Sequence, residues 1–262
     1  MTTEAGVRLA CFLGTFVLVA TWERLAPRRQ LTCARGRRWF ANLSLVVLDT
    51  ALARLLLPVF PVGVALALQE RGAGLLNLLQ LPSWSKVVLT VIALDFVIYL
   101  QHRLFHAQPL FWRLHRMHHT DLDLDVTSGN RFHPLEILVS MGIKLAAVVA
   151  LGAPPMGVLL FEVVLNATSQ FNHGNIRIPL ALDRWLRLVL VTPDMHRVHH
   201  SVIPRETNSN YGFNLPWWDR FCGTYRPQPE AGHLGMTIGL REFRDPGELT
   251  LVRLLVQPFL PR

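Results

Sequence analysis

Four long apolar stretches alternate with polar segments along the first two thirds of the chain: residues 7–25, 41–68, 87–100 and 135–166. Crossing a bilayer as a helix takes about twenty predominantly apolar residues. Each of the first three stretches reaches that length with its flanks and contains at most three charged residues. We therefore expect three membrane-inserted helices. No strongly basic region precedes the first stretch and no A-x-A cleavage site follows it, which predicts a retained anchor rather than a signal peptide.

The fourth stretch is interrupted at its centre by the sequence Gly-Ala-Pro-Pro at residues 152–155, which predicts a break in the helix. Each arm then holds about fifteen residues, or about 22 Å of helix, which is less than the ~30 Å hydrocarbon core. A partly inserted, re-entrant hairpin would return the flanking His133 and His173 to one side of the membrane. The alternative is a single long tilted span, which would separate these two histidines.

The remaining segments predict helices outside the hydrocarbon. Residues 109–120 are amphipathic, and residues 177–191 interleave apolar side chains with arginines, as an interfacial helix would. Thr192 and Pro193 resemble a helix start, because proline suits the first helical position. Turn-rich pieces and a basic tail follow residue 201.

Composition agrees with a membrane protein. Hydrophobic residues make up 51% of the 262-residue chain, charged residues make up 17%, and the mean hydropathy is +0.30. These values are apolar for a soluble domain, although a soluble protein with an unusually apolar core is the alternative. We find no internal repeat and no clean domain boundary, so a single domain is the simplest interpretation.

The positive charge is distributed unevenly. Six arginines lie between residues 24 and 38, after the first apolar stretch, whereas Arg71 and Lys86 are the only cationic residues between the second and third. The positive-inside rule puts the arginine-rich side in the cytoplasm, so the third stretch runs inward and ends there. The net charge of +8 and the pI near 10.4 would suit nucleic acid. Arginines that flank apolar spans are better explained by topology and anionic lipid headgroups, so we expect no nucleic-acid partner.

Histidines are the candidate chemical groups. Eight of the eleven form three clusters with the patterns H-x3-H, H-x2-H-H and H-x2-H-H: His102 and His106; His115, His118 and His119; His196, His199 and His200. Residues three or four apart share one helix face, and neutral imidazole is a ligand for zinc, iron, copper and nickel. Because one ion uses three to six donors, eight converging histidines predict a site for two metals.

Other cofactor sites are not indicated by the sequence. The three cysteines, Cys11, Cys33 and Cys222, are widely spaced and form no C-x2-C pair, so neither a zinc ribbon nor a disulfide framework is supported. The sequence has no G-x-G-x-x-G, Walker or H-E-x-x-H motif and hence no recognisable nucleotide- or flavin-binding domain of its own.

Across about residues 85–226 the chain resembles the fatty acid hydroxylase/sterol desaturase superfamily of membrane-bound di-iron enzymes. The motifs that carry the resemblance are Asp95-x3-Tyr99-x2-His102-Arg103-x2-His106, His115-x2-His118-His119, Arg131-x-His133-Pro134, Asn172-His173-x-Asn175, Thr192-Pro193-x2-His196-x2-His199-His200, Asn210-Tyr211-Gly212 and Trp218-Asp219-x3-Cys222-Gly223-Thr224. Cys222 stands where the family commonly has another small or apolar residue. The first eighty residues are similar only in being apolar.

The resemblance implies O2-dependent hydroxylation or desaturation of a C–H bond in a lipid, sterol, carotenoid or fatty acyl substrate. It implies two iron ions, although zinc could replace them on purification, and O2 as co-substrate. Electrons would come from an external donor, either a ferredoxin or a cytochrome with its reductase. The eight clustered histidines become the catalytic metal ligands, with His173 as a ninth and His133 as a plausible tenth, whereas His233 is expected to be an ordinary surface residue.

Ligating histidines usually pass their second N–H to a carboxylate, carbonyl or water. Candidates for that partner, each of which could instead be a cap or turn residue, are Asp95, Asp194, Asp219, Asn172, Asn175 and Asn210. Arg131 could hold an anionic headgroup or only cap the fold.

These inferences combine into an all-α integral membrane protein with three to four inserted helical segments, a re-entrant hairpin and a cytosolic helical cap that holds the dimetal site. Residues 1–80 would form membrane anchor helices, residues 81–226 the catalytic domain and residues 227–262 a tail. Two other functions remain open. A membrane lipid hydrolase with two zinc ions would need no electron donor, and a metal transporter would need ligands along a path rather than at one membrane face.

Overall fold

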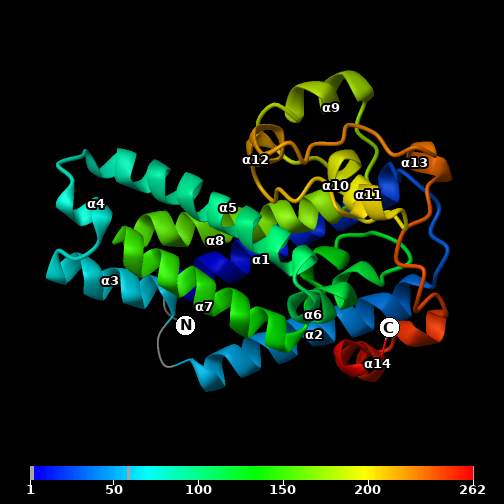
Figure 1. Ribbon diagram of the computed structural model, residues 1–262, viewed down its shortest axis with the longest axis horizontal. Coiled ribbons are helices and arrows are strands. Elements are labelled where there is room, and N and C mark those ends of the chain that lie inside the picture. Colours follow the sequence, from blue (N-terminus) through cyan, green and yellow to red (C-terminus); the bar gives the residue numbers. More distant parts are fainter. Residues whose placement is uncertain (1–2, 58–59, 262) are drawn as a thin grey trace.

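The computed structural model describes residues 3–57 and 60–261, and every regular element within these ranges is a helix. The long helices are α1 (Thr3–Leu25), α2 (Arg35–Leu56), α5 (Ser83–Ala107), α7 (Pro134–Leu151) and α8 (Pro155–His173). They run roughly lengthwise in Figure 1, with the shorter α3 (Pro61–Arg71) and α4 (Leu75–Leu78) at one end. Helix α8 is central and packs against α1, α3, α5 and α10 (Pro193–His199).

The described residues contain four stretches that are long and apolar enough to cross a membrane: Glu4–Leu25, Arg35–Leu78, Ser83–Ala107 and Pro134–Leu151. This confirms the prediction of an all-helical protein with several membrane-inserted segments. The second predicted stretch, residues 41–68, is not one helix, because α2 ends at Leu56 and α3 begins at Pro61. Proline is favoured in the first turn of a helix, because backbone N–H groups there have no hydrogen-bond acceptor within the helix.

The predicted break in the fourth stretch is confirmed. Helix α7 ends at Leu151, and Gly152 caps it in the left-handed conformation with a φ of 58°. A Cβ at Gly152 would lie 2.4 Å from the Ala73 carbonyl oxygen, so both the backbone conformation and the close approach require glycine. The arms contain 18 and 19 residues and are longer than predicted. In the second arm, residues 167–173 continue α8 beyond the apolar stretch to His173.

The short helices gather at the end of the molecule opposite α3 and α4 (Figure 1). The predicted interfacial helix over residues 177–191 is shorter than expected, since α9 covers only Leu180–Leu186. The predicted helix start at residue 192 is confirmed: the Thr192 side chain caps α10 by accepting from the Met195 N–H at 3.3 Å. The other short helices are α6 (Pro109–His119), η1 (Ser128–Asn130), α11 (Pro204–Thr207), α12 (Trp217–Phe221) and α13 (Gly232–Gly235).

The segment after residue 245 packs on the body of the molecule. It forms η2 (Pro246–Leu249), α14 (Leu251–Val256) and η3 (Gln257–Phe259). Leu254 of α14 is buried with two residues of α2 and with Met117 of α6. The Arg113 Nε donates to the Pro258 carbonyl at 2.7 Å, and the Thr120 hydroxyl donates to the Gln257 side chain at 2.9 Å. Helix α6 is therefore held from outside by this segment.

A buried arginine fastens the loop between α6 and η1 to α2. The guanidinium of Arg38 donates to both carboxylate oxygens of Asp121, at 2.7 and 2.8 Å, and to the carboxylate of Asp125 at 2.7 Å. All three side chains are fully buried. Burial opposes ionisation of Asp121, but Arg38 and Arg131 outweigh it and lower the pKa of this carboxyl to about 2. The loop that follows the second histidine cluster is thus fixed by a charged network.

Candidate metal centre

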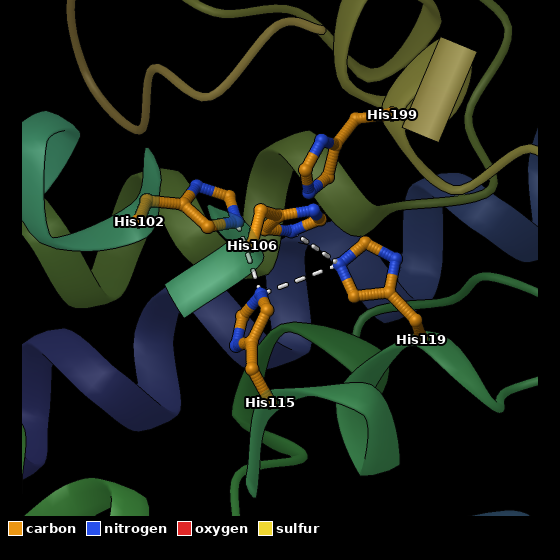
Figure 2. Close-up of side chains that lie close together, drawn as sticks. All are labelled: His102, His106, His115, His119 and His199. Atoms are coloured by element: carbon orange, nitrogen blue, oxygen red, sulfur yellow. Dashed lines mark hydrogen bonds between the residues drawn. The ribbon is translucent and has the colours of Figure 1, made fainter. Parts of the chain in front are cut away.

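Nine histidines converge in two groups at the junction of α5, α6, α8 and α10. Within each group one ring nitrogen per residue lies within 4.8 Å of the others. Figure 2 shows the rings of the first group directed toward a common centre. The first group contains His102, His106, His115, His119 and His199, and the second contains His118, His173, His196 and His200. All are buried except His106, which is half-buried.

Sequence neighbours belong to different groups. His118 lies in the second group and His119 in the first, and His199 and His200 are divided in the same way. Successive residues of an α-helix point about 100° apart, whereas residues four apart share a face. The H-x2-H-H pattern therefore lets one helix supply ligands to two adjacent ions.

The hydrogen bonds of the first group leave lone pairs facing each other. His102 Nδ1 donates to the Tyr211 carbonyl at 2.7 Å, and His115 Nδ1 donates to the Glu136 carboxylate at 2.6 Å. A neutral imidazole that donates from Nδ1 carries a lone pair on Nε2. The two Nε2 atoms are 3.1 Å apart, so an electron-poor centre is needed between them. A metal cation fits this requirement.

The second group has the same arrangement. His118 Nδ1 donates to the Arg131 carbonyl at 3.1 Å and His173 Nδ1 donates to the Ser169 carbonyl at 2.7 Å. Their Nε2 atoms, which therefore carry lone pairs, are also 3.1 Å apart. Backbone carbonyls thus set the tautomer and orientation of these rings, as outer partners of metal ligands commonly do.

Burial keeps the imidazoles neutral. Desolvation lowers the pKa of His115 to about 3. Desolvation, followed by repulsion from neighbouring imidazoles, lowers the pKa values of His118, His199 and His200 well below the ordinary value. Near neutral pH these rings are therefore in the unprotonated form that binds metal ions.

Two histidines lie differently from expectation. His133 is in neither group: its Nδ1 accepts from the Leu135 N–H at 3.1 Å, and its Nε2 donates to the Leu255 carbonyl at 3.2 Å. Both ring nitrogens are thus engaged, in a cap at the start of α7. His233, expected on the surface, is 6% exposed, with its Nε2 3.7 Å from an Asp194 carboxylate oxygen.

The predicted outer partners have structural roles instead. Asp95 accepts from backbone N–H groups near residue 214, and Asp194 pairs with Arg28 and Arg197. Asp219 accepts from the Tyr211 and Gly212 N–H groups, both at 2.8 Å. It reaches His102 only through the Tyr211–Gly212 peptide, whose carbonyl accepts from His102 Nδ1. The three asparagines bond to backbone carbonyls: Asn172, Asn175 and Asn210.

Sequence reasoning missed Glu136, the one carboxylate among residues 3–57 and 60–261 that hydrogen-bonds to a grouped histidine. Its signal was an acidic residue in the first helical turn directly after the His-Pro pair at 133–134. Arg131 is fully buried and donates to the Met117 carbonyl and the Thr120 hydroxyl. It therefore caps the C-terminal end of α6.

A cavity of about 1060 Å³ extends from the first histidine group into the helical bundle. His102 and His115 line one part of it, together with aromatic side chains such as Phe105. Leu55 and Phe60 also line it and are exposed on the outer surface. The cavity thus connects the histidines with the apolar exterior and has room for a long, largely apolar molecule.

Residues 87–224 match the model of the fatty acid hydroxylase family. Ornithine lipid hydroxylase OlsE from Rhizobium tropici is 30% identical over 233 residues, which cover 86% of this chain and 70% of that protein. Methylsterol monooxygenase 2-2 from Arabidopsis thaliana is 29% identical, covering 66% of this chain and 67% of that protein. Human alkylglycerol monooxygenase is 30% identical, covering 58% of this chain and 33% of its own length.

No solved structure matches the chain. The family match covers more than half of the residues and contains both histidine groups. The chain therefore belongs to the fatty acid hydroxylase family of membrane lipid hydroxylases and monooxygenases.

Proposed function

We propose that this protein is a di-iron enzyme that uses O2 to oxidise a C–H bond of a membrane lipid, by hydroxylation or desaturation. The observation that carries the proposal is the pair of buried histidine groups with opposed Nε2 lone pairs at the end of a lipid-sized cavity. An aliphatic C–H bond has neither an acidic proton nor a leaving group, so side-chain acid–base chemistry alone cannot attack it.

The two groups would each hold one ion. Bound iron would supply the reduction of O2 and the hydrogen abstraction that amino acids cannot perform. The protein would contribute orientation and exclusion of water. The Phe132 ring stacks on His118 with centroids 4.7 Å apart, and the Phe213 ring lies 5.2 Å from that of His102. These aromatic side chains would shield the groups and hold the lipid against them.

Electrons would come from a separate ferredoxin or cytochrome with its reductase, because the sequence carries no nucleotide- or flavin-binding motif. The lipid substrate would enter from the bilayer through the apolar opening of the cavity. Ornithine lipid hydroxylase, the relative with the broadest coverage among those described, supports a polar membrane lipid as substrate.

Metal content tests the proposal. We expect active protein to contain close to two metal ions per chain, and we expect iron(II), but not zinc, to restore lipid-dependent O2 consumption to metal-free protein. His133→Asn should retain both ions, because the structure engages both ring nitrogens in hydrogen bonds, whereas His173→Asn should not. Elemental analysis that finds one metal or none in active enzyme would contradict a dimetal centre. Oxygen-independent release of a fatty acid would instead support the di-zinc hydrolase.

We further propose that the histidine groups face the cytoplasm, because the arginine-rich segment 24–38 contacts the region that carries them. Arg28 bonds to Asp194, the Arg29 backbone N–H to Asn175, and Arg38 to Asp121. Three exposed positions test this: Leu110, Arg177 and Arg71. Single cysteines there, in a background without Cys11, Cys33 and Cys222, can be labelled with an impermeant maleimide from either face. We expect labelling at 110 and 177 from the cytoplasmic face and at 71 from the other. Labelling of 110 and 177 from opposite faces would mean that α7 and α8 cross the membrane only once.

A further inference from the structure

The cavity wall beside the first histidine group contains two carboxylates with unsatisfied oxygens. Asp49, on α2, is 8% exposed, and its Oδ1 has no hydrogen-bond partner in the described part of the chain. Glu136, on α7, is 3% exposed; one oxygen receives the His115 proton and the other, Oε2, has no partner. Both residues line the cavity, and the helices that carry them, α2 and α7, pack against each other.

Within the described part of the chain, no lysine or arginine forms an ion pair with Asp49, and Glu136 is paired only with His115. Three lysine or arginine residues line the cavity: Arg8 and Lys144 are bound to Glu162 at 2.5 and 2.8 Å, and Arg54 is exposed. An unpaired carboxylate in an apolar helix is expensive and marks a functional position more often than a structural one.

A third acceptor lies on the same wall. Gln101 of α5 donates to the Ser140 hydroxyl at 2.9 Å and keeps an amide oxygen without a partner. Three helices thus each place an acceptor group on the wall of this cavity. Each group has one oxygen that receives no hydrogen bond from the described part of the chain. A ligand that completes them must supply several N–H or O–H donors, and the two carboxylates favour a positive charge.

We propose that this wall binds the ammonium group of an amino-headgroup lipid, with Asp49 as its principal partner and Glu136 and Gln101 beside it. The inference rests on the proposed function and narrows its substrate class. Because Glu136 bonds directly to His115, the amine would lie one imidazole ring away from the first metal group. The headgroup, rather than the far end of an acyl chain, would then be next to the oxidising centre, with the tails leading out past Leu55 and Phe60.

A pair of probe lipids tests the proposal: ornithine lipid and the same lipid with its side-chain amine acetylated. The two differ in one charge and have the same tails. We expect wild-type protein to prefer the free amine by about ten- to hundredfold, which corresponds to one hydrogen-bonded charge pair. The preference should be seen in KM with iron-loaded enzyme. It should also be seen without turnover, as a larger upward shift of the unfolding midpoint in detergent under argon.

Three variants test whether Asp49 is responsible for the preference for the free amine. Asp49→Asn keeps the shape and removes the charge, and we expect it to bind both lipids equally, with KM changed far more than kcat. Asp49→Glu should retain the preference. Glu4→Gln is the matched control, because Glu4 also lines the cavity but pairs with Arg8 at 2.9 Å; it should leave the preference unchanged.

Equal binding of the two lipids by wild-type protein, or an undiminished preference in Asp49→Asn, would overturn the amine site. Tighter binding of an uncharged polyol lipid than of ornithine lipid would overturn it too. If Asp49→Asn does not fold, comparing the two lipids on wild-type protein and on Asp49→Glu still tests the proposal. Failure of the proposed function has a different signature: neither lipid is oxidised with iron, reductant and O2, although the difference in binding can still be measured.

Discussion

Replacing His118 with alanine should remove the ion of the second histidine group and leave the first occupied, and His119→Ala should do the reverse. The two side chains are neighbours in sequence but belong to different groups. Each substitution removes one ligand nitrogen from a group of four or five histidines. The remaining nitrogens of that group would therefore bind their ion more weakly. We expect each variant to keep about one metal per chain and to lose at least nine tenths of its turnover, which is ~1.4 kcal/mol of barrier or more.

Metal analysis of the two variants, with site-selective spectroscopy of the remaining ion, measures this outcome. The variants should still insert and fold, because the deleted rings lie at the end of α6 outside the apolar spans. His133→Asn is a matched control, since it changes a histidine next to the site that lies in neither group. Activity above about a tenth of wild type in both alanine variants would argue against ligand roles for these residues.

Replacing Arg38 with methionine should destabilise the protein by about 3–5 kcal/mol, the usual cost of leaving buried charges without their partner. The substitution strands the carboxylates of Asp121 and Asp125, which are fully buried. The low pKa of Asp121 means that its carboxylate is charged at neutral pH in the native protein. The loop between α6 and η1, which carries both aspartates, should become more mobile in this variant.

Chemical unfolding in mixed micelles gives the change in free energy, and Arg37→Met is the control. Arg37 is exposed, so the control removes the same charge one residue away, where solvent screens it. If Arg38→Met is no more destabilising than Arg37→Met, the buried network does not hold the loop. A gain in stability on adding Asp121→Asn to Arg38→Met would support the stranded charge as the cause.

Local sequence patterns predicted the parts of the fold that depend on local geometry. The four-residue spacings predicted which histidines of one helix share a group, whereas histidines three residues apart, such as His115 and His118, lie in different groups. The glycine and prolines at 152–155 predicted the break between α7 and α8. The N-cap residue Thr192 and the proline in the first turn of α10, Pro193, could be predicted from the sequence in the same way. Each of these features is set by residues within one or two helical turns, so the sequence contains the necessary information directly.

Features that depend on distant contacts could not be predicted in the same way. Nothing in the local pattern shows that His102 and His115 oppose each other, or that the partner of His115 is Glu136, because that contact crosses from α6 to α7. His133 has the residue type and neighbourhood of a ligand, but its nitrogens are engaged by α7 and by Leu255. Its exclusion depends on where residues 251–259 dock.

That docking also imposes an order of assembly during translation. Arg113 and its carbonyl partner Pro258 are separated by 145 positions, and Arg116 of α6 likewise donates to backbone carbonyls at 257 and 260. On the ribosome, α6 is made long before these partners, so three of the nine grouped histidines (His115, His118 and His119) lie on a helix that is not yet held in place. The contacts that hold α6 in its native position can therefore form only after residue 260 has left the exit tunnel.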